Sequence, residues 1–297
     1  MKLLLYILGA LILLGLAVLV IDNNRFVVRK YKIGGSRVKK PLRIAFLTDL
    51  HENGYGRANK ALFEAVRKTE PDMILLGGDL IISSKAEKGK GWTRNTASLM
   101  EGLKGTCPIY YVDGNHEMRL KEPEYGLQGR YRELEEILKK AGAVPLHNRK
   151  EVLKEYGIDI CGLELDHDCY RRFNLKDLTS SDIEKKIGRA DPGRFTLLLT
   201  HNPDYFEIYA RWGADAVLSG HIHGGIVRIP FTRLGVINPR FRLFPRYTGG
   251  RYEAKVLDAG KNHPSTMVLS CGLGMHTLPV RAFNPAELSV VDIVPES

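Results

Sequence analysis

Paired thiolate chemistry has little support in this sequence. Its four cysteines, Cys107, Cys161, Cys169 and Cys271, show no C-x-x-C spacing, which argues against a structural zinc cluster or a dithiol redox motif. Their even number permits disulfides, but Cys107 and Cys271 lie in or beside apolar runs that predict strands. We therefore expect four buried free thiols.

Signatures of nucleic-acid binding are also missing, although the formal net charge is +10. No zinc-finger, helix-turn-helix or RNP-like pattern occurs. Between Asp22 and Lys40, seven basic residues stand against one acid, so this segment carries six of the ten positive charges. The remainder is ordinary for a domain of this size. We expect no nucleic-acid partner.

A long run without charge is present at the start of the chain. Leu3 to Ile21 are nineteen apolar or small residues, enough to cross a bilayer as a helix. A cleaved signal peptide is the alternative, but no A-x-A-like site precedes Asp22 and only Lys2 is basic ahead of the run. We predict a single-pass anchor in the cell membrane (residues 1–21) and a basic juxtamembrane segment (residues 22–41) that contacts membrane lipids.

The side of the membrane that holds the remaining chain is subject to two opposed arguments. The basic residues behind the anchor outnumber Lys2 ahead of it, so the positive-inside rule favours the cytoplasmic face. Against this, a very short N-terminal tail is often kept inside the cell, which would place the remaining chain on the outer side. We favour the cytoplasmic face.

After the anchor, short apolar runs alternate with segments of helical spacing, which predicts a parallel sheet with crossover helices. A first strand is expected near Phe26 to Ile33, with a turn at Gly34 to Ser36. The polar, glycine-rich segment Ser83 to Thr93 predicts a loop near the rim of the site. Tyr156-Gly157 predicts a hairpin, and Ser181 to Glu184 predicts a capping box that opens a helix. The expected strands are Arg43–Thr48, Met73–Leu76, Ile109–Val112, Phe195–Thr200 and Ala214–Ser219, and the expected helices are Asn59–Thr69, Thr96–Leu103 and Tyr131–Ala141.

Each of five apolar runs ends in potential metal ligands. Because open α/β sheets place their ligand sites outside the carboxyl ends of the strands, these side chains should meet at one edge. Carboxylate, imidazole and amide groups without thiolate suit Mn, Fe, Zn or Mg. Seven ligands are too many for one tetrahedral ion and about right for two ions that share a carboxylate. The candidates are Asp49, His51, Asp79, Asn115, His201, His221 and His223.

The order D-x-H, G-D, G-N-H-E, H and G-H-x-H resembles the calcineurin-like metallophosphoesterase superfamily from about Pro41 onward. The resemblance implies an α/β four-layer sandwich over residues 42–297, with two mixed β-sheets flanked by helices. It also implies a hydrolase of phosphoric ester or pyrophosphate bonds, in which two divalent metal ions share an attacking hydroxide. Manganese is the leading expectation for the ions.

The same resemblance implies roles for the individual residues. Asp49, His51, Asp79 and His223 would hold one ion, and Asp79, Asn115, His201 and His221 the other, so that Asp79 bridges them. His116 would act on the leaving oxygen as a general acid or as a charge stabiliser. Glu117 completes the G-N-H-E block.

A narrower resemblance comes from the segments after the H-x-H pair, which include Gly272-Leu273-Gly274 and Leu278 to Arg281. They are similar to bacterial transmembrane metallophosphoesterases, some of which are assigned to UDP-2,3-diacylglucosamine hydrolysis, and so imply a lipid-linked substrate. Ile226 departs from that group, which commonly has a polar residue there. The alternatives are a phosphodiesterase of soluble nucleotides and a non-catalytic metal-dependent protein-binding module.

Two further residues are candidates for substrate binding. Arg228 opens a stretch to Arg251 in which arginines alternate with aromatic residues. Such a stretch is either a solvated excursion or a flap that grips phosphate or touches the membrane. His276 follows a glycine-rich turn and is expected at the rim of the site.

Overall fold

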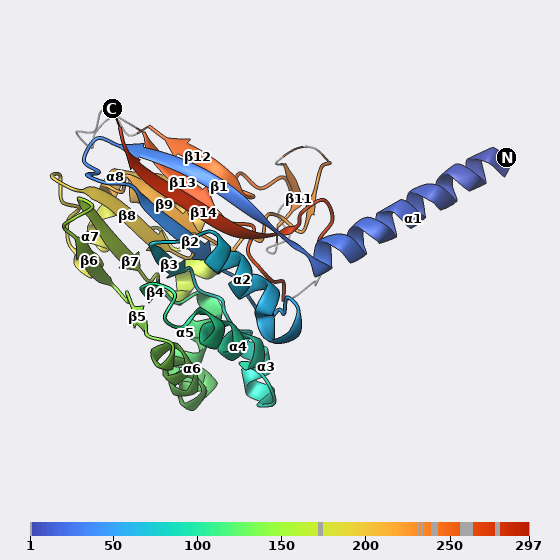
Figure 1. Cartoon of the computed structure of the whole chain (residues 1–297), viewed down its shortest axis with the longest axis horizontal. Helices are drawn as coiled ribbons and strands as arrows, with labels where there is room; N and C mark the ends of the chain where they lie inside the picture. Colours follow the sequence, from blue (N-terminus) through green and yellow to red (C-terminus); the bar gives the residue numbers. More distant parts are fainter. Residues whose placement is uncertain are drawn as a thin grey trace.

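Two six-stranded sheets form the globular part of the computed structural model, which describes residues 2–171, 175–230, 232, 234–238, 243–255, 264–276 and 280–296 (Figure 1). The strand order is β1-β14-β2-β3-β4-β5 in the first sheet and β12-β13-β9-β8-β7-β6 in the second. The first comprises β1 (Phe26–Gly35), β14 (Ala286–Pro295), β2 (Leu42–Leu47), β3 (Met73–Leu76), β4 (Ile109–Tyr111) and β5 (Ala143–Pro145). The second comprises β12 (Gly250–Ala254), β13 (Ser265–Leu269), β9 (Ala216–Ser219), β8 (Phe195–Thr200), β7 (Ile158–Leu163) and β6 (Arg149–Leu153).

Three apolar cores separate four layers. The central core joins the sheets, where Phe46 of the first packs with Phe195 and Leu218 of the second. A second core lies between the first sheet and helices α2 (Lys60–Lys68), α4 (Arg94–Leu103) and α6 (Gln128–Lys140). A third lies between the second sheet and helices α7 (Ser180–Ile187) and α8 (Phe206–Trp212). Strands covered on both faces are apolar throughout, and the predicted four-layer α/β sandwich is confirmed.

The predicted parallel pairing is confirmed from β2 through β5, whose strands are all parallel. In the second sheet, β7, β8 and β9 are parallel as well. Parallel strands bring their carboxyl ends to one edge, and the loops after β2, β3, β4, β8 and β9 carry the candidate ligands there. The hairpin predicted at Tyr156-Gly157 joins β6 and β7, which are antiparallel.

Four local predictions are corrected. Ser83 to Thr93 is not one loop, because Ser83–Lys88 forms α3 and Trp92 is buried against the outer core. Thr179, rather than Ser181, caps α7: its side chain accepts a hydrogen bond from the Asp182 amide, so the helix begins at Ser180. The expected turn at Gly34 to Ser36 begins late, since β1 extends to Gly35. Cys107 is half-buried, whereas the other three free thiols are buried.

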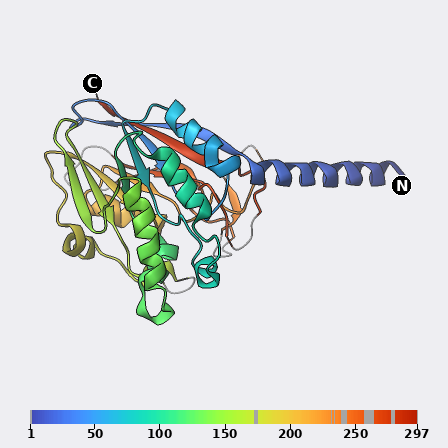
Figure 2. The same cartoon turned by 60° about the horizontal axis from the view of Figure 1, so that its bottom comes forward.

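The N-terminal helix α1 (Lys2–Asn24) projects away from the globular part (Figures 1 and 2). Its mean hydropathy reaches 3.0 over an 18-residue window, so it is long and apolar enough to cross a membrane by length and composition. β1 begins at Phe26 and pairs in parallel with β14 from Phe26 opposite Ala286 to Gly35 opposite Pro295. Much of the basic segment 22–41 is therefore a strand of the first sheet.

Candidate metal centre

Asp79 lies in the middle of a cluster of buried histidines and carboxylates. Its Oδ2 atom is 3.1 Å from His201 Nε2 and 3.7 Å from His51 Nε2. Its Oδ1 atom accepts a hydrogen bond from the His116 backbone amide at 2.9 Å. One oxygen of this carboxylate thus faces imidazoles that come from both sheets, while the other is held by the start of α5 (Asn115–Lys121).

Asp49 holds a second position in the cluster. Its Oδ1 atom lies 3.8 Å from the Nε2 atoms of both His51 and His201, and 3.9 Å from that of His223. The His221 backbone amide donates to both oxygens of Asp49, at 3.1 and 3.0 Å. The carboxylate after β2 is therefore joined directly to the loop after β9.

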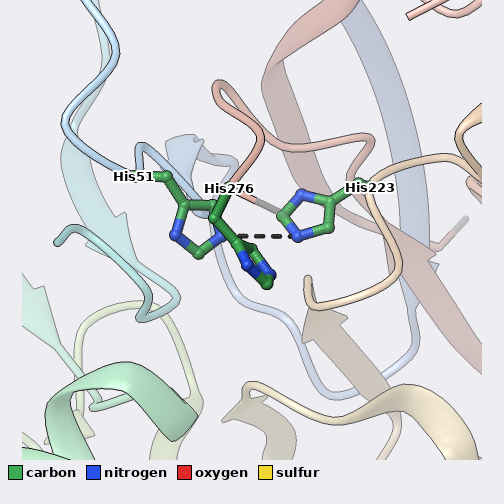
Figure 3. A group of neighbouring side chains, drawn as sticks. All are labelled: His51, His223 and His276. Carbon is green, nitrogen blue, oxygen red and sulfur yellow. Dashed lines mark hydrogen bonds between the residues drawn. The ribbon is translucent and has the colours of Figure 1, made fainter. Parts of the chain in front are cut away.

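The two histidines that follow β2 and β8 present a lone pair to the cluster. His51 Nδ1 donates to the Ile81 carbonyl at 3.2 Å, and His201 Nδ1 donates to the Gly77 carbonyl at 2.7 Å. A carbonyl can only accept a hydrogen bond, so Nδ1 carries the proton. In the neutral ring, Nε2 then has a free lone pair that can bind a metal ion. His51 Nε2 lies 3.3 Å from His223 Nε2 (Figure 3). Converging ring nitrogens of this kind are typical of metal ligands.

The electrostatics of the cluster favour a bound cation. Burial raises the pKa of Asp49 to about 6. Burial opposes protonation of His201, but the Asp79 and Asp49 carboxylates outweigh it and raise the pKa of His201 to about 9. Burial holds the pKa of His51 well below its usual range, as it does that of His223. His51 and His223 thus stay neutral, while the proton that the two buried carboxylates hold on His201 occupies a place where a metal cation would balance their charge.

Unpaired polar atoms provide a test of whether a metal fits. Asn115 Oδ1 and His223 Nδ1 are buried and have no hydrogen-bond partner within the protein. Buried polar atoms are almost always paired, so each such atom needs an explanation. Oxygen and imidazole nitrogen atoms without thiolate suit borderline to hard divalent ions. The residues present fit such ions.

Backbone strain is concentrated at the same place. Asp49, His51, Asp79, His221 and His223 all have positive φ angles, between 47° and 74°. Residues other than glycine rarely adopt this conformation, and it costs of order 1–3 kcal/mol each. Strain at five neighbouring positions indicates that the fold holds these side chains in place for a function.

Glu117 supports the loop that carries Asp79. Its carboxylate accepts hydrogen bonds from the backbone amides of Asp79 at 2.7 Å, Leu80 at 2.8 Å and Gly114 at 2.9 Å. A Cβ atom on Gly78 would lie 2.3 Å from the Gly114 nitrogen, so only glycine permits this approach. The G-D and G-N-H-E motifs thus interlock through their backbones.

His116 is held through one ring nitrogen, Nδ1, while the other, Nε2, has no hydrogen-bond partner. The Ser83 backbone amide donates to His116 Nδ1 at 3.1 Å, and Ser83 Oγ lies 3.0 Å from the same atom. Because an amide can only donate, Nδ1 accepts and the proton of the neutral ring is on Nε2. His116 Nε2 is buried without a partner. Burial lowers the pKa of His116 to about 4, so the neutral ring predominates near pH 7.

A polar cavity of about 300 Å³ opens beside His116. Asn115, Arg119 and His276 are among its lining residues, together with Ser83 and Ser84. The centroid of the His276 ring lies 4.6 Å from that of His51 (Figure 3) and 4.6 Å from that of His116. His276 is thus located where a rim residue is expected.

Arg228 has partners within the fold. It is buried, its Nε donates to the Gly224 carbonyl at 2.8 Å, and its Nη2 lies 3.2 Å from Cys271 Sγ. These contacts stabilise the loop that follows the H-x-H pair. Of the arginine and aromatic stretch, Phe231, Arg233, Arg240, Phe241 and Arg242 lie outside the described residues, as do Leu278 and Pro279.

Another group of potential ligands is neutralised within the protein. Asp113, His147 and Glu164 lie close enough together to share an ion. However, the Lys121 ammonium is 2.5 Å from Asp113 Oδ2 and 3.1 Å from Glu164 Oε1. This group is an ion-pair network with its own internal cation.

Two residues near the cluster have no signal in the sequence. The Tyr170 ring lies 5.3 Å from that of His221, and the Asn284 side chain donates to the His223 carbonyl at 2.7 Å. Neither belongs to a motif, and each reaches the cluster only through tertiary packing.

Comparison with known proteins decides the family. A family model described as calcineurin-like phosphoesterase matches residues 42–225, more than half of the chain. The chain belongs to this family. Its clustered histidines and aspartates are candidate ligands for the divalent metals that members of this family typically bind.

Bacterial relatives of this calcineurin-like phosphoesterase have similar names. An uncharacterised metallophosphoesterase of Helicobacter pylori is 29% identical, with 88% of this chain and 62% of that protein aligned. The chain thus spans less than two thirds of that relative. The metallophosphoesterase YkuE of Bacillus subtilis is 31% identical, over 84% of this chain and 77% of YkuE. The phosphodiesterase YaeI of Escherichia coli is 28% identical, over 64% and 63% of the two chains.

Proposed function

We propose that this chain is a membrane-anchored phosphohydrolase with two divalent metal ions, which acts as a phosphodiesterase or pyrophosphatase. The observation that carries the proposal is the position of Asp79 Oδ2, 3.1 Å from His201 Nε2 and 3.7 Å from His51 Nε2. A carboxylate oxygen between imidazoles of two sheets suits a ligand shared by two ions.

In this proposal the ligands divide into two sets around Asp79. Asp49, His51 and His223 would complete one site, in which the Nε2 atoms of the two histidines are 3.3 Å apart. Asn115, His201 and His221 would complete the other. When bound, the ions would supply positive charge for the phosphoryl oxygens and would lower the pKa of a shared water. We expect both ions to be manganese.

The residues of the protein would orient the substrate and assist the leaving group. His116 carries its proton on Nε2, because the Ser83 amide occupies Nδ1. It would therefore donate a hydrogen bond from Nε2 to the departing oxygen or to a phosphoryl oxygen. Arg119 and His276 line the cavity beside His116 and offer further donors to a phosphate group.

A lipid-linked phosphoester or pyrophosphate is the substrate class that we propose, with UDP-2,3-diacylglucosamine as one example. α1 is long and apolar enough to anchor the enzyme in a membrane, where such substrates reside. The name of YaeI supports diester hydrolysis. We place the catalytic domain at the cytoplasmic face, since the basic residues follow α1; paired C-terminal phosphatase and fluorescent-protein fusions would test this orientation.

The test of the proposal combines metal counting with a substrate panel. The full chain in detergent should contain two equivalents of divalent metal by elemental analysis. It should hydrolyse bis-p-nitrophenyl phosphate, and should act faster on a lipid-linked pyrophosphate than on a soluble nucleotide diester. Hydrolysis without bound metal would contradict the dinuclear site, and equal rates on both natural substrate classes would contradict the lipid preference.

A further inference from the structure

Exposed apolar side chains gather on one part of the globular surface. Outside α1, only Val28, Tyr125 and Val144 are comparably exposed elsewhere in the described ranges. Leu243 and Phe244 are each 67% exposed and Leu234 is 61% exposed. The gathered residues, which we call the apolar platform, are Ile229, Leu234, Leu243, Phe244, Val280 and Phe283.

The part of the platform next to α1 is fastened to the end of that helix. The Arg281 amide donates to Asn23 Oδ1 at 3.2 Å, and the Asn284 amide donates to Asp22 Oδ2 at 3.0 Å. These two bonds flank Phe283 and follow Val280. The segment that carries both apolar side chains is therefore held against the last turn of α1.

A ladder of backbone hydrogen bonds continues from there to the remaining platform residues. The Arg228 amide donates to the Ala282 carbonyl at 3.0 Å, in the short strand β10 (Val227–Arg228). β10 pairs with β11 (Gly235–Ile237), and the Ile229 amide donates to the Leu234 carbonyl at 3.0 Å. The Phe244 amide then donates to Val236 at 2.9 Å. The platform is one continuous structure that begins at α1.

The platform lies on the side of the globular part from which α1 projects, so it would face the bilayer that the helix enters. Figures 1 and 2 both show β11 on the side of the globular part from which α1 projects. α1 ends at Asn24 and β1 begins at Phe26, so a single residue separates the helix from the first sheet. A connection this short, reinforced by the bonds of Asp22 and Asn23, leaves little freedom for the domain to turn away.

We propose that the apolar platform inserts into the interfacial layer of the same lipid bilayer that α1 enters. Each Å² of apolar surface removed from water contributes about 25 cal/mol, and an apolar face beside a membrane anchor obtains this gain without a further partner. A lipid surface is the favoured occupant because the platform is continuous with α1. The inference rests on the insertion of α1, which belongs to the proposed function, and does not depend on hydrolysis.

This contact sets where the catalytic cluster lies relative to the lipid. Asn284 directly follows Phe283, and its side chain donates to the His223 carbonyl at 2.7 Å and to that of Gly225. The residue that supports the H-x-H loop is thus the immediate neighbour of a platform residue. Insertion would hold the cluster close to the headgroups, where the phosphate of an amphiphilic substrate lies.

The experiment uses tryptophan reporters in the full chain, reconstituted into phosphatidylcholine bilayers with and without brominated acyl chains. The native Trp92 and Trp212 are buried, so the wild-type signal is the baseline. Phe244→Trp and Leu243→Trp report on the platform, and Leu13→Trp reports on α1. Val144→Trp is the matched control, because Val144 is 46% exposed on β5, at the opposite edge of the first sheet from β1.

Insertion predicts that lipid brominated near the headgroup quenches both platform reporters, and that the added fluorescence of Val144→Trp stays unquenched. Lipid brominated deep in the acyl chain should quench Leu13→Trp. Quenching of Leu13→Trp alone would overturn the platform contact while leaving the anchor in place. No quenching at any position would overturn the insertion of α1 and the platform contact together. Equal quenching of Val144→Trp and Phe244→Trp would show that the contact is not specific to the platform.

Discussion

The Asp22 carboxylate, at the end of α1, accepts a hydrogen bond from the Asn284 backbone amide at 3.0 Å. The Asn284 side chain in turn donates to the His223 carbonyl at 2.7 Å. The end of α1 and the H-x-H loop are therefore linked through two hydrogen bonds of Asn284. Both residues are buried, so neither bond competes with water.

Replacing Asp22 should weaken the fold and the metal site together. Asp22→Ala leaves the buried Asn284 amide without an acceptor, which costs about 1–3 kcal/mol. We expect a lower midpoint of thermal unfolding in detergent and a weaker affinity for manganese by calorimetry. Asn24→Ala is the control, because Asn24 donates only to the Val20 carbonyl of its own helix. An unchanged manganese affinity in Asp22→Ala would show that the end of α1 does not influence metal binding.

Asp79→Asn should abolish metal-dependent hydrolysis of bis-p-nitrophenyl phosphate. The substitution removes the charge of the carboxylate that faces both His201 and His51. The loss of activity in Asp79→Asn should exceed that caused by replacing a ligand assigned to one ion, as in His223→Ala. Asp191→Asn is the matched control, since Asp191 pairs with Arg194 away from the cluster. Full activity with two metals still counted would refute the bridging role.

His116→Ala should retain both metals and lose roughly 10²- to 10⁴-fold in turnover, the usual value of one acid–base group. The loss should be smallest for substrates with very good leaving groups, which need little assistance. A series of aryl phosphodiesters measures this dependence. His167→Ala, on a half-buried histidine 3.9 Å from Glu122, controls for loss of a ring. Equal losses across the series would show that His116 only positions the phosphate.

Ser83→Pro should reduce turnover while the fold is kept. Proline removes the amide hydrogen and the hydroxyl that contact His116 Nδ1, and its Cδ atom takes the place of that hydrogen, so the ring loses both contacts and is displaced. Ser83 is the first residue of α3, and Ile82 before it is extended (φ −117°, ψ 116°), so both positions tolerate proline. Ser83→Ala retains the amide and should keep most of the activity. Equal turnover in Ser83→Pro and Ser83→Ala would show that the Ser83 amide plays no part in turnover.

Metal removal should lower thermal stability as well as activity. Without metal ions, the proton on His201 is the main positive charge beside the buried Asp49 and Asp79 carboxylates, and it compensates them less than two divalent cations would. Adding back manganese at about 100 times its dissociation constant should restore about 2.7 kcal/mol, measured as a rise in the unfolding midpoint. Asp79→Asn should show a smaller rise. An identical rise in that variant would place the stabilising ions elsewhere.

The residues whose proximity can be predicted from the sequence are those whose positions follow from strand ends. Asp49 and His201 come directly after a buried apolar run, Asp79 follows one after two glycines, and parallel strands bring such ends together. Their burial and proximity need only the topology. The supporting residues are different, because Glu117 and Ser83 act on backbone amides that come close only when the loops interlock.

Local errors arose where a few contacts override composition. The segment Ser83 to Thr93 is polar overall, yet Ala86 and Trp92 are buried in the outer core and hold it in place. The strand β1 contains basic residues, but Glu287 of β14 lies 3.4 Å from the Arg29 guanidinium and accepts a hydrogen bond from Tyr31 at 2.8 Å. The strand predicted near Phe26 to Ile33 is confirmed as β1, but its place beside β14 depends on that partner strand and could not be predicted from its own residues.

The place of β14 has a consequence for biosynthesis. β14 is the last strand in chain order, yet it lies between β1 and β2 in the first sheet. While the ribosome is still translating the chain, α1 is available to the membrane insertion machinery, but β1 has no neighbour to pair with. With α1 as the proposed anchor, the nascent polypeptide would be tethered at the bilayer with its first sheet incomplete until β14 has been synthesised. Completion of the first sheet must therefore await the synthesis of β14, and premature termination before Ala286 would leave β1 unpaired.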